Sequence, residues 1–201
     1  MTPWFITFEG GEGCGKTTQA KRLQQRLGDS AIFTREPGGT PGAEILRTML
    51  LHGDHEFSAP AQVFLHFAAR TEHVERLIKP TLAAGKTVIC DRFFDSTLAY
   101  QGFGQYAPRA TIEELSKVIG IVPDLTFILR VSPAIAAARV ASRGAALDRY
   151  ESHDAAFHAR VAAGFEEIAA QNPARCAIID ADQNIDQVHQ AIWATYLART
   201  Q

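Results

Sequence analysis

Eight residues near the N-terminus, Gly10 to Thr17, constrain the fold more than any other part of the chain. They read G-G-E-G-C-G-K-T and match the phosphate-binding loop pattern G-x-x-x-x-G-K-[ST] at every fixed position. In such loops the glycines let backbone N–H groups turn toward phosphate oxygens, and the following helix directs its positive N-terminus at the same anion. We therefore predict that Lys16 reaches the β- and γ-phosphates of a nucleoside triphosphate and that the Thr17 hydroxyl binds Mg²⁺.

The residues on either side of this loop fit the same interpretation. The preceding run Trp4–Phe8 is aromatic and β-branched, as a buried strand requires, and the run Lys16–Leu27 has helical composition and ends at Gly28. The alternative is a glycine-rich turn that precedes a lysine by chance. The strand and the helix lie where the motif requires them, which favours the phosphate-binding loop.

Short β-rich runs alternate with helical stretches along the rest of the chain, a pattern typical of a parallel sheet covered on both faces. The five predicted strands lie near Trp4–Phe8, Ala31–Thr34, Thr87–Cys90, Leu125–Val131 and Ala177–Ile179. The predicted helices are Lys16–Leu27, Gly42–Leu51, Ala61–Ala83, Thr111–Ile119, Pro133–Ser142, Asp154–Ala170 and Ile185–Ala198. We expect one α/β domain over residues 1–201, with the P-loop NTPase fold and a five-stranded parallel sheet.

The formal net charge of −2 favours neither a nucleic-acid coat nor an anionic membrane surface as partner. No apolar run approaches the roughly 20 residues that a membrane span requires, and the N-terminus lacks the basic region of a signal peptide. We therefore expect a cytoplasmic protein that binds no nucleic acid and no membrane. The three cysteines are far apart, which indicates neither a disulfide framework nor a zinc site.

Charged residues follow the second and third predicted strands, where ligands bind in sheets of this kind. Arg35 and Glu36 open a loop rich in glycine and proline, and Asp91 and Arg92 follow the third strand directly. A carboxylate beside a phosphate loop commonly holds Mg²⁺, and an arginine fork suits phosphate. Simple ion pairs are the alternative in both places.

The predicted helix Ala61–Ala83 carries an arginine within an apolar stripe. Val63, Phe67, Arg70 and Val74 share one face, and a buried arginine is unfavourable without a partner. Phe67 and Arg70 lie one turn apart, so the ring could stack on a flat base while the guanidinium bonds its edge. The alternative is an arginine that extends out of the stripe or is paired internally.

A loop at about residues 143–151, which contains Arg143 and Arg149 and follows Arg139, resembles a mobile lid over phosphates. Phosphoryl transfer needs positive charge delivered to the migrating group, and such a lid would supply it. A solvated loop with exposed arginines is the alternative.

Taken together, these segments resemble one family, bacterial thymidylate kinase, and they occur in family order over nearly the whole chain. The matching segments are Phe8–Thr18, Thr34–Thr40, Phe67–Arg70, Cys90–Arg92, Ser96–Gly102, Pro123–Thr126, Arg143–Glu151 and Ile179–Ala181. The loop of residues 10–17 carries Glu12 and Cys14 in place of an arginine, so the resemblance is to the type with catalytic arginines in the lid. It implies transfer of the γ-phosphoryl group of ATP to dTMP, with Mg²⁺, by a homodimer.

The resemblance also implies roles for individual residues. Phe67 would stack on thymine, Arg70 would bond its carbonyl edge, and Tyr100 would pack against the sugar. The remaining substrate-binding residues would be Glu12, Arg35, Glu36, Arg47, Arg92, Ser96, Thr97 and Gln101. ATP would contact Gly10, Gly11, Glu12, Gly13, Cys14, Gly15, Lys16, Thr17, Thr18, Arg139 and Arg143. The catalytic residues would be Glu12, Lys16, Arg92, Arg143 and Arg149, and the metal ligands Thr17 and Asp91.

Two other functions fit the phosphate loop alone. One is a kinase of the same architecture with a different acceptor, and the other is an NTP-hydrolysing switch. The chain lacks the N-K-x-D segment of GTPases and the L-S-G-G-Q-like segment of transporter ATPases, which disfavours the switch. For Cys14 we predict a reactive thiolate near the helix N-terminus, the alternative being that it only fills a slot for a small residue.

Overall fold

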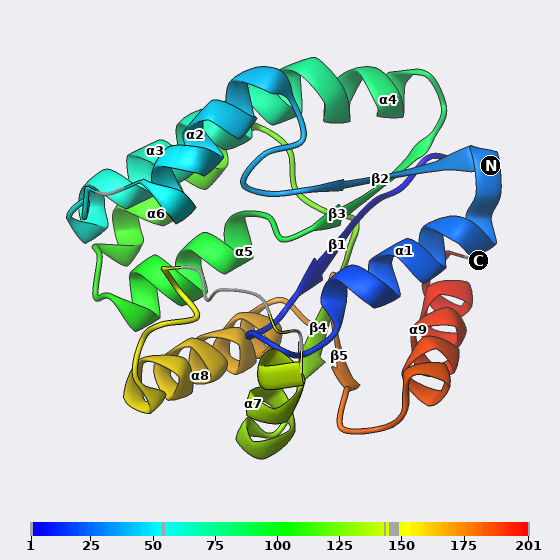
Figure 1. Cartoon of the computed structure of the whole chain (residues 1–201). Helices are drawn as coiled ribbons and strands as arrows, with labels where there is room; N and C mark the ends of the chain where they lie inside the picture. The colour runs from blue at the N-terminus through cyan, green and yellow to red at the C-terminus, as the bar shows by residue number, and fades with distance from the viewer. Residues whose placement is uncertain (1, 54, 143, 145–148, 201) are drawn as a thin grey trace.

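The computed structural model describes residues 2–53, 55–142, 144 and 149–200, which form a parallel β-sheet with helices on both faces (Figure 1). The five strands are β1 (Phe5–Glu9), β2 (Ala31–Arg35), β3 (Thr87–Asp91), β4 (Leu125–Arg130) and β5 (Cys176–Asp180). They lie in the order β2-β3-β1-β4-β5, and all neighbouring pairs are parallel. The predicted α/β sheet is confirmed, with each strand boundary within one residue of its predicted place.

The helices also follow the predicted pattern, with two local differences. Helices α1, α2, α6, α7, α8 and α9 span Lys16–Leu27, Pro41–His52, Arg109–Ile119, Pro133–Ser142, Ala155–Gln171 and Ile185–Thr200. The predicted helix of residues 61–83 consists of α3 (Ala59–His73), a π-helical turn η2 (Val74–Ile78) and α4 (Lys79–Ala83). The sequence did not predict α5 (Phe94–Thr97) and the π-helical turn η3 (Leu98–Gly104), because their hydroxyl, amide and glycine residues carry no helical periodicity.

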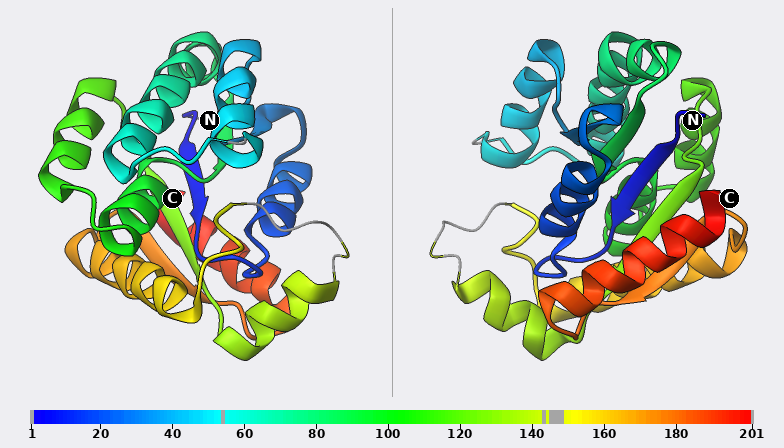
Figure 2. Two further views of the ribbon diagram at one scale, coloured as in Figure 1. Left: turned by 60° about the vertical axis from the view of Figure 1, so that its left-hand side comes forward. Right: turned by 90° about the vertical axis from the view of Figure 1, so that its right-hand side faces the viewer.

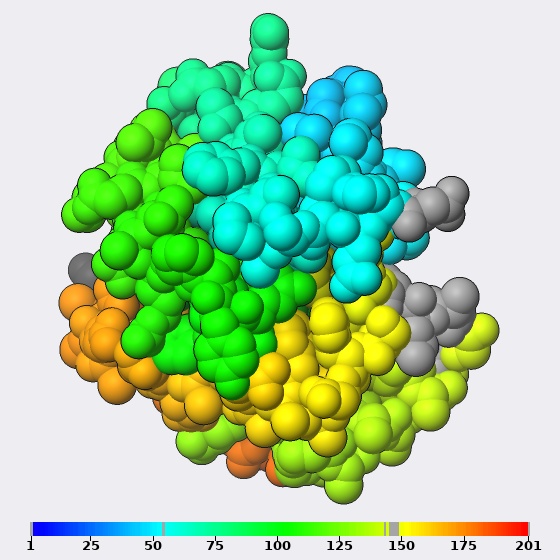
Figure 3. All heavy atoms as spheres, turned by 90° about the vertical axis from the view of Figure 1, so that its left-hand side faces the viewer, coloured from blue at the N-terminus to red at the C-terminus, as the bar shows by residue number. Residues whose placement is uncertain are grey.

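The two faces of the sheet bury different residues of the same strands. On β1, Ile6 and Phe8 pack with α1 and α9, whereas Phe5 packs on the other side with residues of α3 and α6. This alternation follows from the period of two in a β-strand. Figure 2 shows α1 and α9 together on one side of the sheet, and Figure 3 shows α3, in cyan, beside the green segment with η3 and α6.

The register of the strands brings the polar residues at their ends to one edge of the sheet. Asp91 pairs with Phe8 of β1 and with Arg35 of β2, so the ends of three strands are level. The chain leaves β1 through a left-handed Gly13 (φ +70), where a Cβ atom would lie 2.5 Å from the carbonyl oxygen of Ala136 on α7. Only glycine fits so close a contact, which fixes the phosphate loop against α7. None of the helices in the described part of the chain has the length and hydrophobicity of a membrane span.

Candidate active site

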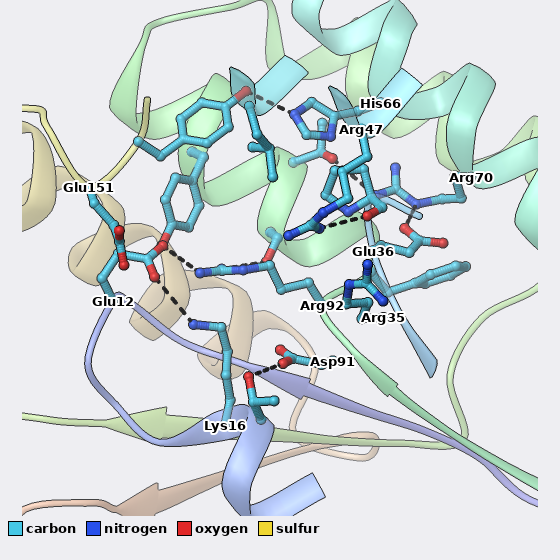
Figure 4. Close-up of a pocket in the computed structure, with 18 of the residues that line it drawn as sticks. Glu12, Lys16, Arg35, Glu36, Arg47, His66, Arg70, Asp91, Arg92 and Glu151 are labelled. Atoms are coloured by element: carbon cyan, nitrogen blue, oxygen red, sulfur yellow. Dashed lines mark hydrogen bonds and ion pairs between the residues drawn. The ribbon is translucent and has the colours of Figure 1, made fainter. Parts of the chain in front are cut away.

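A cavity of about 340 Å³ opens at this edge of the sheet (Figure 4). Its wall at one end is the start of α1 with Lys16 and Thr17, and at the other end it includes Arg70 of α3 and Gln101 of η3. The two ends therefore combine a phosphate loop with a polar pocket, which is the arrangement expected of a site that holds two substrates.

At the phosphate-loop end, Lys16 is held back by the loop itself. Its Nζ atom donates to the carbonyl oxygen of Gly11 over 3.1 Å and lies 3.7 Å from a carboxylate oxygen of Glu12. Lys16 is buried, so its charge acts in a region with little water to screen it. Lys16 lines the cavity at the end formed by the phosphate loop.

The hydroxyl of Thr17 donates directly to the Oδ2 atom of Asp91. The other carboxylate oxygen, Oδ1, is buried and has no hydrogen-bond partner among the described residues. A buried carboxylate oxygen without a partner is unfavourable, whereas a carboxylate and a hydroxyl are ligands that Mg²⁺ prefers. Thr17 and Asp91 therefore fit a magnesium ion, as the sequence predicts.

Arg92 joins the two ends of the cavity. Its backbone has φ +71, an uncommon conformation for a side-chain-bearing residue. Its Nη2 atom lies 2.5 Å from Glu12 and 3.1 Å from the hydroxyl of Tyr100, and Nη1 donates to the Gly10 carbonyl. Burial opposes the charge of Arg92, but the carboxylate of Glu12 and its neighbours outweigh it and hold the pKa above its ordinary value.

Glu9, at the end of β1, holds the segment that follows Arg92. Its Oε1 atom accepts a 2.7 Å hydrogen bond from the backbone N–H of Phe93, and its Oε2 atom lies 2.5 Å from Oγ of Ser96. Complete burial and, next, the charge of Asp95 raise the pKa of Glu9 to about 8. Glu9 is not among the site residues predicted from the sequence, although a glutamate that ends an apolar strand was a visible signal.

At the other end, Arg70 forms a buried ion pair with Glu36, 2.8 Å from Nε to Oε2. Its Nη2 atom donates to Thr97, whereas Nη1 is buried and without a partner among the described residues. The internal pairing that the sequence left as an alternative is therefore present. Because Arg70 also lines the cavity, its unpaired nitrogen remains for a ligand.

The carboxylate of Glu36 is shared with His73, whose Nδ1 lies 2.9 Å from Oε1 and whose Nε2 lies 2.7 Å from the hydroxyl of Thr34. With Cys90 these donors form a compact group of metal-ligand types. Arg70 already occupies Glu36, the Cys90 thiol donates to the Arg92 carbonyl, and burial raises the pKa of that thiol. The group is therefore a hydrogen-bond network rather than a metal site. No periodic pattern along the chain indicated a site role for His73.

Phe67, which the resemblance assigns to base stacking, lies in the hydrophobic core. Phe67 is 4% exposed, lies in the hydrophobic cluster with Phe93, and does not line the cavity. The cavity wall is formed by the preceding residue, His66, whose Nε2 lies 3.0 Å from the Tyr150 hydroxyl. Phe67 instead lies below Arg70, with the guanidinium 4.7 Å from the ring centre. The predicted apolar stripe is present, and His66 rather than Phe67 lines the cavity.

Most other predicted site residues line the same cavity. They are Glu12, Gly15, Thr18, Arg35, Arg47, Ser96, Thr97, Tyr100 and Gln101. Arg35 is paired with Glu44 at 3.1 Å, and Arg47 donates to the Pro37 carbonyl, so both are held at the mouth of the cavity. The Glu36–Pro37 peptide bond between them is cis.

The three arginines predicted in or near the lid differ in their placement. Arg143 lies outside the described residues. Arg149 is not in the cavity wall and donates to the backbone carbonyls of Gly53 and His55, at 2.6 and 2.9 Å. Arg139 lies 3.5 Å from the Gly13 carbonyl.

Cys14 is 2% exposed and packs in the core cluster of β1 and α1. This burial agrees with the alternative in which it only fills a slot behind the loop.

Comparisons with known proteins agree with one another. A family model described as thymidylate kinase matches residues 8–192. The chain is 49% identical over 195 residues to a thymidylate kinase of Caulobacter vibrioides, with 94% of this chain and 93% of the relative covered. It is 47% identical over 195 residues to that of Gluconobacter oxydans, covering 94% and 91%. Among solved structures, a thymidylate kinase from Ehrlichia chaffeensis superposes with a TM-score of 0.82 at 35% identity, over 98% and 99% of the two chains.

Proposed function

The chain belongs to the thymidylate kinase family and is a nucleoside monophosphate kinase that transfers a phosphoryl group to dTMP, and we propose how its residues divide that task. The observation that carries the proposal is that the same cavity has Lys16 and Thr17 at one end and Arg70 and Gln101 at the other. The first end suits a nucleoside triphosphate, and the second suits the base of dTMP.

The donor is ATP, bound by the loop of residues 10–18 and by Lys16. Arg139, which lies near the Gly13 carbonyl and the Gln183 carbonyl, borders the donor site from α7. Thr17 and Asp91 would hold Mg²⁺, for which the unpaired carboxylate oxygen of Asp91 supplies a ligand. When bound, the ion neutralises charge on the transferring phosphate.

The acceptor dTMP lies with its base toward Arg70, Thr97 and Gln101 and its phosphate toward Arg92. The unpaired Nη1 of Arg70 is a donor for a carbonyl oxygen of the base. Arg35 and Arg47 at the mouth, with Glu36 and Ser96 in the wall, complete the polar surround of the monophosphate. Tyr100, hydrogen-bonded to Glu12, packs beside the sugar.

The transfer itself requires position and charge rather than a strong base. The acceptor oxygen belongs to a phosphate that is already anionic near neutral pH. Arg92 lies between the two ends, and an incoming phosphate can replace Glu12 as its partner. Lys16 supplies charge from the donor side. Arg143 and Arg149 supply further charge from the lid. To do so, Arg149 must release the carbonyl oxygens of Gly53 and His55 and bind a phosphate oxygen in their place.

The test is a coupled assay of ADP release with ATP and Mg²⁺, run with and without dTMP. ADP release that depends on dTMP is the expected result. Release at the same rate without any nucleoside monophosphate would point to an NTP-hydrolysing switch and would contradict the acceptor assignments. Replacing dTMP by dUMP, dCMP, dGMP or thymidine then measures the breadth of the acceptor site.

The chain also assembles as a homodimer in the cytoplasm, where the pathway to dTTP requires its product. The exposed apolar side chains Ile45 and Met49 of α2 and Phe64 of α3 support an interface, because α2 and α3 pack together and water contact with these side chains is unfavourable. Analytical ultracentrifugation should give a dimer for the wild type and a monomer for Phe64→Glu. A wild-type monomer at micromolar concentration would contradict the assembly.

A further inference from the structure

Four buried polar side chains form a chain of hydrogen bonds in the wall of the acceptor end. They are His66 and Gln62 of α3, Gln101 of η3 and Tyr150, and each is at most 8% exposed. The Tyr150 hydroxyl lies 3.0 Å from Nε2 of His66 and 2.9 Å from Oε1 of Gln62. Nε2 of Gln101 lies 3.4 Å from the same Gln62 oxygen, which makes this the longest link. This series of hydrogen bonds therefore joins the segment after residue 148 to the end of the cavity that faces the base.

The direction of every bond in this chain is fixed at one end by the backbone. The amide nitrogen of Gln62 donates to the carbonyl oxygen of Phe57 over 2.8 Å. A carbonyl can only accept, so the nitrogen of the Gln62 amide must face Phe57 and its oxygen must face the cavity. Both groups that meet this oxygen are then donors, namely the Tyr150 hydroxyl and the amide nitrogen of Gln101.

These hydrogen-bond directions determine which ring nitrogen of His66 carries the proton. The single hydroxyl proton of Tyr150 is used toward Gln62, so Tyr150 accepts from His66, and His66 carries its proton on Nε2. Burial and then the charges of Arg70 and Arg92 lower the pKa of His66 to about 3, which keeps the ring neutral. Its Nδ1 atom is thus a bare acceptor. Nδ1 has no hydrogen-bond partner among the described residues and is not one of the atoms buried without one.

The same hydrogen-bond directions determine the orientation of the side-chain amide of Gln101. Its amide nitrogen faces Gln62, which leaves its carbonyl oxygen as an acceptor at the base end of the cavity. The base end therefore offers two acceptors, on Gln101 and His66, beside the unpaired donor Nη1 of Arg70. An imide base such as thymine or uracil presents an N–H between two carbonyl oxygens and complements this set. Cytosine presents a lone pair at that ring nitrogen and meets acceptors instead.

We propose that His66 and Gln62 determine base specificity: His66 presents an acceptor to the imide N–H of a pyrimidine base, and Gln62 is a positioning residue that orients Gln101 to do the same. The proposal deepens the proposed function and rests on it for the identity of the acceptor. Neither residue needs to touch the reacting phosphate, so their effect is on base choice and acceptor affinity rather than on the transfer step.

The test measures kcat/KM for dTMP and for dCMP in the wild type, Gln62→Leu, His66→Phe and Tyr150→Phe. Each variant should lower the ratio of dTMP to dCMP by about tenfold or more, the scale of one lost hydrogen bond, mainly through KM for dTMP. The double variant His66→Phe with Tyr150→Phe should lose little more than either single variant, because both break the same chain. His52→Phe, at the exposed end of α2, is the matched control and should keep the ratio.

A second measurement is independent of activity. Nitrogen-15 NMR of histidine-labelled wild-type protein should show His66 with its proton on Nε2 and no titration between pH 5.5 and 8. A proton on Nδ1, a titration in that range, or ratios unchanged in all three variants would overturn the inference. If the wild type does not phosphorylate dTMP at all, the proposed function fails instead. The NMR result still decides the donor and acceptor directions of the hydrogen bonds that join Gln62, Tyr150 and His66.

Discussion

Nε of Arg70 lies 2.8 Å from Oε2 of Glu36, and the two side chains are only 2% and 3% exposed. A buried ion pair of this kind fixes geometry more reliably than it adds stability, because desolvation opposes the attraction. Glu36 is held in turn by His73, so Arg70 is oriented before any ligand arrives. The arginine that interrupts the apolar stripe of α3 is thus compensated and still has one unpaired nitrogen.

Arg70→Lys should weaken dTMP binding by about 10- to 100-fold, which is the effect of losing one or two hydrogen bonds to a carbonyl oxygen. Lysine keeps the charge but not the planar fork that serves Glu36, Thr97 and the base together. Isothermal titration calorimetry with dTMP in the absence of ATP measures this directly. Arg109→Lys, in an exposed ion pair with Glu167, is the control. Equal affinity of Arg70→Lys and the wild type would contradict the assignment of Arg70 to the base.

Asp91→Asn should lower kcat by about 10- to 100-fold and raise the Mg²⁺ concentration needed for half-maximal rate. The reason is that asparagine retains one oxygen for the Thr17 hydroxyl but loses the charge of the unpaired carboxylate oxygen. The measurement is a Mg²⁺ titration of the steady-state rate. Asp186→Asn, whose carboxylate is in an exposed pair with Arg22, serves as control. An unchanged Mg²⁺ dependence would remove Asp91 from the metal site.

The fold and the donor end could be predicted from the sequence because their signals are local. A phosphate loop is a fixed spacing of a few residues, and a strand that ends in Asp91-Arg92 carries its functional residues with it. Since parallel strands end at one edge of the sheet, residues that follow the predicted strands, such as Arg35, Glu36 and Asp91, were expected at that edge. The register places Arg35 level with Asp91.

The acceptor end depended on packing that no local pattern contains. Steps of four and three place Val63, Phe67 and Arg70 on one face of α3, but only the sheet beneath decides which part of that face is core. Phe67 packs against the sheet, whereas His66, one residue away, reaches the cavity. In the same way, the pairing of Gln62 with Tyr150 joins residues 88 positions apart, which spacing cannot reveal.

Arg143→Ala should lower kcat by about 10²- to 10³-fold, the effect of removing one donor that stabilises the transition state. KM for dTMP should change much less, because the acceptor residues are elsewhere. Arg149→Ala provides the comparison, since its guanidinium binds the carbonyls of Gly53 and His55 and its loss should also lower Tm. Steady-state kinetics and thermal unfolding separate the two effects. Arg76→Ala, with an exposed arginine of η2, is the control, and an unchanged kcat in Arg143→Ala would reject the lid role.

Glu9→Gln should stabilise the protein, and increasingly so as the pH rises. Burial raises the pKa of Glu9 to about 8, above the 4.5 of a free carboxyl. Between these values the folded state binds a proton that the unfolded state has lost, so the free energy of unfolding of the wild type falls as pH rises through this window. Glutamine is uncharged and can still accept from the Phe93 N–H, so the free energy of unfolding of the variant does not fall with pH for this reason.

The measurement is Tm for the wild type and Glu9→Gln from about pH 5.5 to about pH 9.5, a range that extends past the folded-state pKa of about 8. The difference in Tm should grow by up to roughly 3–6 °C per pH unit, since one pKa unit is about 1.4 kcal/mol and 1 kcal/mol shifts Tm by about 2–4 °C in a domain of about 200 residues. The difference should level off above the folded-state pKa, where both states are ionised. Glu113→Gln, an exposed residue of α6, should show no such trend. A constant difference across the range would mean that Glu9 stays ionised in the folded protein and binds the Phe93 N–H as a charged carboxylate.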